Sequence, residues 1–149
     1  MTTPITNRVP FSFEFFPPNT PVGDEKLRAV VQELGAAGPE FFSVTYGAGG
    51  STRERTHATV KRILGETALT PAAHLTCVAA TKTEIDSVIR AYWDIGVRHL
   101  VALRGDLPSG TATAGEFRYA AELVQFVRET QGADWHIEVA AYPEYHPEQ

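Results

Sequence analysis

Two hydrophobic periods alternate along this chain. Short runs rich in β-branched and aromatic residues have the period of two that is typical of strands, and the segments between them have the spacing of amphipathic helices. The expected strands are Phe11–Phe16, Phe41–Gly47, Ala72–Val78, His99–Gly105 and His136–Tyr142. The expected helices contain Leu27–Leu34, Thr52–Leu64, Ile85–Tyr92 and Glu116–Thr130.

The order of these elements predicts an α/β protein with a parallel sheet. Strand starts lie about 30 residues apart, which is the length of a β/α unit. Strands that are separated by helices pair in parallel. Two helix starts carry a capping box, Ser51 with Glu54 and Thr81 with Glu84.

The faces of the predicted strands distinguish two closures of this sheet, an open doubly wound sheet and a (β/α)₈ barrel. In each strand the polar residues share one face, and the apolar residues share the other. The polar sets are Ser12 and Glu14, Ser43 and Thr45, His74 and Thr76, Arg104 and Asp106, and Glu138 and Tyr142. One polar face per strand favours the barrel, because strands covered by helices on both faces are more continuously apolar.

A barrel of this kind needs eight strands and about 250 residues. The chain has 149 residues and five predicted strands, so we expect only about the first five β/α units. Either the chain is a truncation, or a partner supplies the rest.

Composition and charge narrow the function classes. A formal net charge of −5 and the lack of a basic stripe argue against nucleic-acid binding. No apolar run approaches the roughly 20 residues that span a bilayer, and Met1–Pro10 lacks the apolar core of a signal peptide. The single cysteine, Cys77, cannot form an internal disulfide and is expected to be a small buried hydrophobe. We therefore expect a soluble cytoplasmic protein without nucleic-acid or membrane partners.

Glu14 is the first candidate for chemistry, because it interrupts an otherwise aromatic strand. A carboxylate in such a strand is costly to bury without a partner or a proton. A carboxylic acid that remains protonated near neutral pH can act as a general acid. The alternative is an edge strand with Glu14 in water.

The segment Ser43–Thr56 is a strand, a glycine-rich turn and a capped helix. Such a turn allows close approach of a ligand to the backbone, and the helix start favours an anion. The segment matches neither the Walker loop nor the dinucleotide fingerprint, so a turn that merely needs glycine geometry is the alternative.

Further polar residues follow the later strands. Arg104 can pair with an anion, and Asp106 can accept hydrogen bonds from a polar heterocycle; the alternative is a surface ion pair. Tyr142 and His146 offer stacking and hydrogen bonding, or simply lie in a Pro-rich loop. A lone His74 is more often structural than catalytic, and no His or Cys spacing indicates a metal site.

Taken together, five segments closely resemble the methylenetetrahydrofolate reductase family: Phe11–Pro18, Ser43–Thr56, His74–Val78, Ala102–Pro108 and Val139–Pro147. The resemblance implies a flavin-containing (β/α)₈ barrel. It covers nearly the whole chain but only about the first half of a family member. It implies an N-terminal extension over residues 1–10 and the N-terminal portion of the barrel over residues 11–149.

The resemblance also implies an activity. Family members reduce 5,10-methylenetetrahydrofolate to 5-methyltetrahydrofolate with NAD(P)H through FAD, in one-carbon and methionine metabolism, and a homo-oligomer is expected. Glu14 matches the general acid, which would protonate a folate ring nitrogen, and the neighbouring Phe16 is expected to give it an apolar environment. Asp106 matches the aspartate near the flavin that also contacts the folate. The implied FAD-binding residues are Thr45, Tyr46, Ala48, His74, Arg104, Gly105, Asp106, Ala120, Tyr142 and His146.

Two other functions stay open from the sequence. One is a noncatalytic barrel fragment that needs a partner. The other is a flavin-free barrel lyase or aldolase with Glu14 as base, although Lys61 and Lys82 are predicted in helices or their starts rather than at strand ends.

Overall fold

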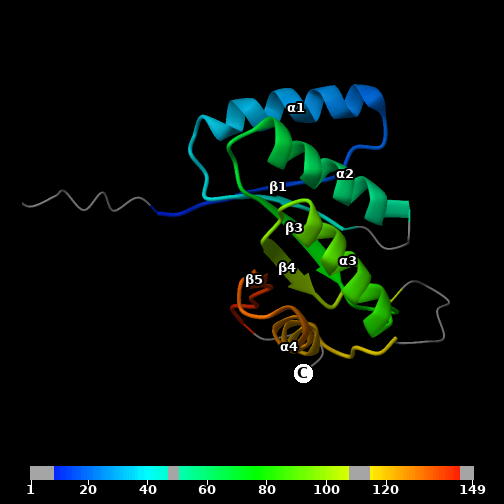
Figure 1. The fold of residues 1–149 in the computed structure, drawn as a ribbon. Helices are drawn as coiled ribbons and strands as arrows, with labels where there is room; N and C mark the ends of the chain where they lie inside the picture. The colour runs from blue at the N-terminus through cyan, green and yellow to red at the C-terminus, as the bar shows by residue number, and fades with distance from the viewer. Residues whose placement is uncertain (1–8, 47–50, 108–114, 145–149) are drawn as a thin grey trace, which may run out of the picture.

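The expected alternation of strands and helices is present in the structure, a computed structural model that describes residues 9–46, 51–107 and 115–144 (Figure 1). The elements are β1 (Phe13–Phe15), α1 (Pro21–Gly35), β2 (Phe42–Val44), α2 (Ser51–Glu66), β3 (Pro71–Thr76), α3 (Lys82–Asp94), β4 (His99–Leu103), α4 (Ala120–Gln131) and β5 (His136–Val139). Most strands are shorter than predicted at their carboxyl ends. Helix α4 begins at Ala120 rather than at Glu116.

The five strands form one parallel sheet in the order β1-β2-β3-β4-β5. This confirms the predicted sequential arrangement. Right-handed crossovers between successive parallel neighbours place every connecting helix on the same face of the sheet. The α/β fold is therefore that of consecutive β/α units of a barrel.

The core lies between the sheet and these helices. Side chains from the strands, such as Phe15, Val44 and Leu75, pack in one cluster with residues of all four helices. The helix residues include Val31 of α1, Val60 of α2, Ile89 of α3 and Leu123 of α4. Burial of this apolar surface drives the packing of the helices on the sheet, and polar residues such as Glu14 and His74 are left on the other face.

Cys77 belongs to the same core, as the sequence predicts. It is fully buried, and burial raises the pKa of its thiol to about 11. A thiol that stays protonated at neutral pH is a poor nucleophile.

The predicted face of β4 is wrong. The register pairs Val101 with His74 and Leu103 with Thr76. Leu103 therefore shares the polar face of β3, and Arg104 does not. The physical reason is that bulky branched side chains fill the interior of a barrel, so polarity does not identify the inner face of this strand. Asp106 was predicted to lie on the same face as Arg104, but it lies beyond the end of β4.

Helix starts are fixed by local caps. Thr81 and Glu84 form the predicted capping box at α3, and the hydroxyl of Thr20 accepts a hydrogen bond from the N–H of Gly23 at α1. The side chain of Ser51 lies outside the described residues.

Of the helices in the described part of the chain, none combines the length and apolar character that crossing a bilayer requires.

The two outer strands, β1 and β5, have one strand neighbour each among the described residues. Large apolar side chains are exposed beside them: Phe16 is 78% exposed and Val139 is 57% exposed. Val139 is paired with the fully buried Ala102, so it continues an apolar face that is covered in the neighbouring strand. Unpaired edges and exposed apolar residues template association with other chains.

We expect the 149-residue chain, expressed alone, to self-associate through these edges. The change Val139→Lys should shift the molecular mass in solution toward the monomer, because a charge on an edge strand opposes edge-to-edge pairing. Light scattering coupled to size exclusion measures this. The matched control is Val30→Lys, an exposed valine on α1, which should leave the association unchanged. A stable monomer before any substitution would contradict the prediction.

Candidate functional site

A pocket of about 530 Å³ opens at the carboxyl ends of β4 and β5, beside the start of α4. Its lining contains five of the residues that the family resemblance assigns to the FAD site: Arg104, Gly105, Asp106, Ala120 and Tyr142. Ala102, Leu103, Tyr119, Val139 and Ala140 complete it. The volume is in the range of small-molecule sites. Ligand sites of barrels form at this end of the strands.

Gly105 lines this pocket and packs closely against the end of β3 on its other side. Its φ angle is +84°, which L-residues with a side chain rarely adopt. A Cβ at this position would lie 2.8 Å from Cγ1 of Val78 and 2.9 Å from Cβ of Thr76. The chain is held there by the N–H of Val78, which donates to the carbonyl of Arg104 at 2.8 Å. Only glycine therefore fits at the end of β4.

The change Gly105→Ala is expected to lower the free energy of unfolding. The loss should exceed that of a glycine-to-alanine change at a position where glycine is favoured only by a positive φ angle. Gly96→Ala is the matched control, because Gly96 also has a positive φ but meets only one side-chain atom, at 3.4 Å. The control should cost about 1–2 kcal/mol from the backbone alone, and Gly105→Ala at least about 1 kcal/mol more from the clash. Urea denaturation measures both. Equal losses would show that the close approach is unimportant.

Glu14 and His74 form a second group, on the face of the sheet opposite the helices. Oε2 of Glu14 lies 3.3 Å from Nε2 of His74. The side chain of His74 is 9% exposed and that of Glu14 is 54% exposed. The predicted face of both residues is confirmed. The apolar environment expected from Phe16 is absent, because Phe16 is itself exposed.

Burial lowers the pKa of His74, because it disfavours the imidazolium, and the charge of Glu14 partly opposes this. His74 is therefore neutral near neutral pH. A neutral ring can donate an N–H to a carboxylate or accept the O–H of a carboxylic acid, so His74 can orient Glu14 in either form while leaving it accessible.

The lowered pKa of His74 makes folding sensitive to acid. Below pH about 6.5 the unfolded state binds a proton that the folded state does not. Stability should thus fall as the pH drops through this range, by at most about 1.4 kcal/mol per pH unit for this group. His74→Gln should flatten that part of the profile, measured as the urea midpoint between pH 8 and pH 5. Superimposable profiles for the two proteins would contradict this assignment.

A third group lies where β2 leads into α2. The hydroxyl of the fully buried Thr56 is 2.9 Å from the carbonyl of Thr45 and 2.9 Å from that of Thr52, so it ties the strand end to the helix. Arg53 donates from Nε to the hydroxyl of Tyr46. Burial raises the pKa of Tyr46, and Arg53 opposes this.

The predicted site residues thus fall into three groups in the described part of the chain. The pocket of Arg104 does not include Glu14, His74, Thr45 or Tyr46 among its lining residues. Ala48 and His146 lie outside the described residues. Tyr119 and Val139 were not predicted from the sequence as lining residues of the pocket. Only their positions, immediately before α4 and at the end of β5, could have indicated this.

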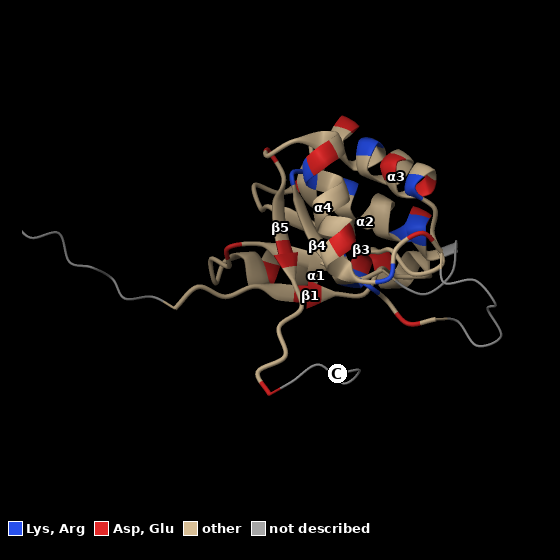
Figure 2. Ribbon diagram, turned by 90° about the horizontal axis from the view of Figure 1, so that it is seen from below, with Lys and Arg blue, Asp and Glu red and all other residues tan. Residues whose placement is uncertain are grey.

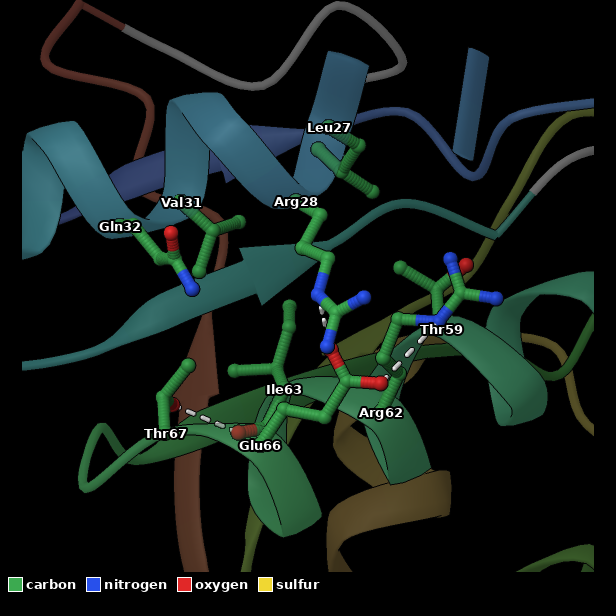
Figure 3. A pocket seen from close by; sticks show the side chains of 9 residues that line it. All are labelled: Leu27, Arg28, Val31, Gln32, Thr59, Arg62, Ile63, Glu66 and Thr67. Atoms are coloured by element: carbon green, nitrogen blue, oxygen red, sulfur yellow. Dashed lines mark hydrogen bonds and ion pairs between the residues drawn. The ribbon is translucent and has the colours of Figure 1, made fainter. Parts of the chain in front are cut away.

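A further cavity in the described part of the chain is much smaller than this pocket. It lies between α1 and α2, where Arg28 pairs with Glu66 at 2.9 Å (Figure 3). Its volume of about 20 Å³ holds little more than one water molecule. Acidic and basic residues are interleaved along α3 (Figure 2), so this helix presents no basic stripe.

Fold and pocket together define an α/β protein of consecutive β/α units with a ligand-sized pocket at the strand carboxyl ends. The chain belongs to the methylenetetrahydrofolate reductase family, whose model matches residues 2–149. It is 46% identical over 144 residues to the 5,10-methylenetetrahydrofolate reductases of Salmonella typhimurium and Escherichia coli, covering 97% of this chain and 47% of each relative. It is 38% identical to methylenetetrahydrofolate reductase (NADH) 1 of Zea mays, covering 95% of this chain and 24% of that relative. The chain therefore spans about half the length of the bacterial relatives.

Proposed function

We propose that residues 11–149 are the N-terminal portion of the barrel of a flavin-dependent 5,10-methylenetetrahydrofolate reductase, and that residues 1–10 are an extension. The reaction is the reduction of 5,10-methylenetetrahydrofolate to 5-methyltetrahydrofolate by NAD(P)H. The complete protein is expected to be cytoplasmic and homo-oligomeric. The observation that carries the proposal is the pocket that gathers Arg104, Gly105, Asp106, Ala120 and Tyr142.

The residues of this pocket suit FAD. Gly105 lines the pocket without a side chain of its own, so its backbone is open to a ligand on the side away from Val78 and Thr76. Arg104 offers a guanidinium to anionic or polar ligand atoms, and Tyr142, which is 52% exposed, offers an aromatic face. FAD, when bound, supplies two-electron transfer between the nicotinamide and the folate.

Glu14 is the proposed proton donor for the folate ring nitrogen. Its position on the face free of helices and its half-exposed side chain support this role, because a substrate can reach the carboxyl group. The neutral ring of His74 would hold that group in one orientation. Asp106, an exposed residue of the pocket lining, is the proposed contact to the folate.

A lyase or aldolase that uses a Schiff-base lysine finds less support. The three lysines of the chain, Lys26, Lys61 and Lys82, lie in α1, α2 and α3 rather than at the carboxyl end of a strand.

The test uses the complete protein that carries this chain. Glu14→Gln is expected to lower folate reduction by about 10²–10⁴-fold, the range for loss of a general acid, while NAD(P)H still reduces the flavin at close to the normal rate. Stopped-flow absorbance of the two half-reactions measures both. Glu33→Gln, on the exposed surface of α1, is the control and should change neither.

Two results would overturn the proposal. If the purified protein had no visible flavin absorption even after incubation with FAD, FAD would not be its cofactor. An equal fall in both half-reactions in Glu14→Gln would make Glu14 a structural residue.

A further inference from the structure

Two histidines and a glutamate meet at the amino end of the sheet, opposite the pocket. His99 begins β4 and His136 begins β5, and the parallel register pairs them directly. Glu138 follows on the same face of β5. Its Oε1 lies 2.8 Å from Nε2 of His136 and 3.6 Å from Nε2 of His99. One ligand atom from each of the three residues lies within 4.8 Å of the others.

Within this cluster, the ring nitrogen Nε2 of His99 has an unusual environment. The side chain is only 8% exposed, and Nε2 is buried without a hydrogen-bond partner. Phe41 and His136 flank the ring, with centroids at 4.4 Å and 4.3 Å. A buried polar atom without a partner is costly and rare. Glu138 reaches His136 at hydrogen-bond distance, but its contact with Nε2 of His99, at 3.6 Å, is too long for a hydrogen bond.

We propose that His99, His136 and Glu138 bind a divalent transition metal ion, with Zn²⁺ as the expected occupant. Two imidazole nitrogens and one carboxylate oxygen are a known zinc ligand set, and water takes the fourth position. Ligands at zinc distances in a tetrahedron lie about 3.4 Å apart. The observed separations of 2.8 Å and 3.6 Å bracket this value, so small side-chain rotations suffice. The ion would link β4 to the outer strand β5.

The test is zinc titration of the metal-free protein, with a chromophoric chelator as competitor and folding checked by circular dichroism. We expect the variants His136→Gln and Glu138→Gln to bind one ion fewer per chain, or to bind it at least tenfold more weakly. Both side chains are partly exposed, so these variants should fold. His57→Gln, on α2, is the control and should bind as the unchanged protein does. Co²⁺ in place of zinc should give the visible absorption of a four-coordinate site, which the two variants lose.

Zinc binding that is the same in His136→Gln, Glu138→Gln and the unchanged protein would overturn the proposal. So would the absence of binding at millimolar zinc in the folded protein.

Discussion

The parallel register of the five strands is the constraint on which two groups of candidate residues depend. One is the pair of Glu14 and His74, and the other is the cluster of His99, His136 and Glu138. Successive side chains of a strand face opposite sides, and the four helices pack on one side only. Phe15, Val44 and Leu75 are buried beneath them. The same register leaves Glu14 and His74 together on the other face, where no helix separates them from a ligand. A shift by one residue would exchange these two sets, and burial of the apolar set opposes that shift.

At the carboxyl ends the constraint changes from alternation to backbone geometry. Ala79 and Gly105 both have positive φ angles, and a Cβ on Gly115 would lie 2.6 Å from the backbone nitrogen of Ala80. The N–H of Glu116 donates to the carbonyl of Ala80 at 3.0 Å, so the segment before α4 is fixed against the loop after β3. These contacts set where α4 starts, and hence where Ala120 and Tyr119 line the pocket.

The sequence predicted the alternation of elements because most helices carry the apolar spacing of a helix face and two helix starts carry the residues of a capping box. It predicted the face of Glu14 and His74, since β1 and β3 alternate cleanly between polar and apolar residues. The sequence did not predict the face of β4. Val101 and Leu103 are apolar residues on its inner face, so this strand lacks the alternation of polar and apolar residues that identifies a face. The cluster of His99, His136 and Glu138 was missed for a different reason. Its members come from two strands whose pairing register no local pattern specifies.

Strand β5 connects the two ends of the sheet. It begins at His136, and the wall of the pocket starts at Val139, three residues and about 10 Å further along a strand. Because β5 has a strand neighbour on one side only in the described part of the chain, β4 is the strand that sets its position there. The side chains at its amino end therefore bear on the placement of Val139, Ala140 and Tyr142 at its carboxyl end. A contact that fixes His136 and Glu138 to β4 also fixes one wall of the pocket, although it lies at the opposite end of the sheet.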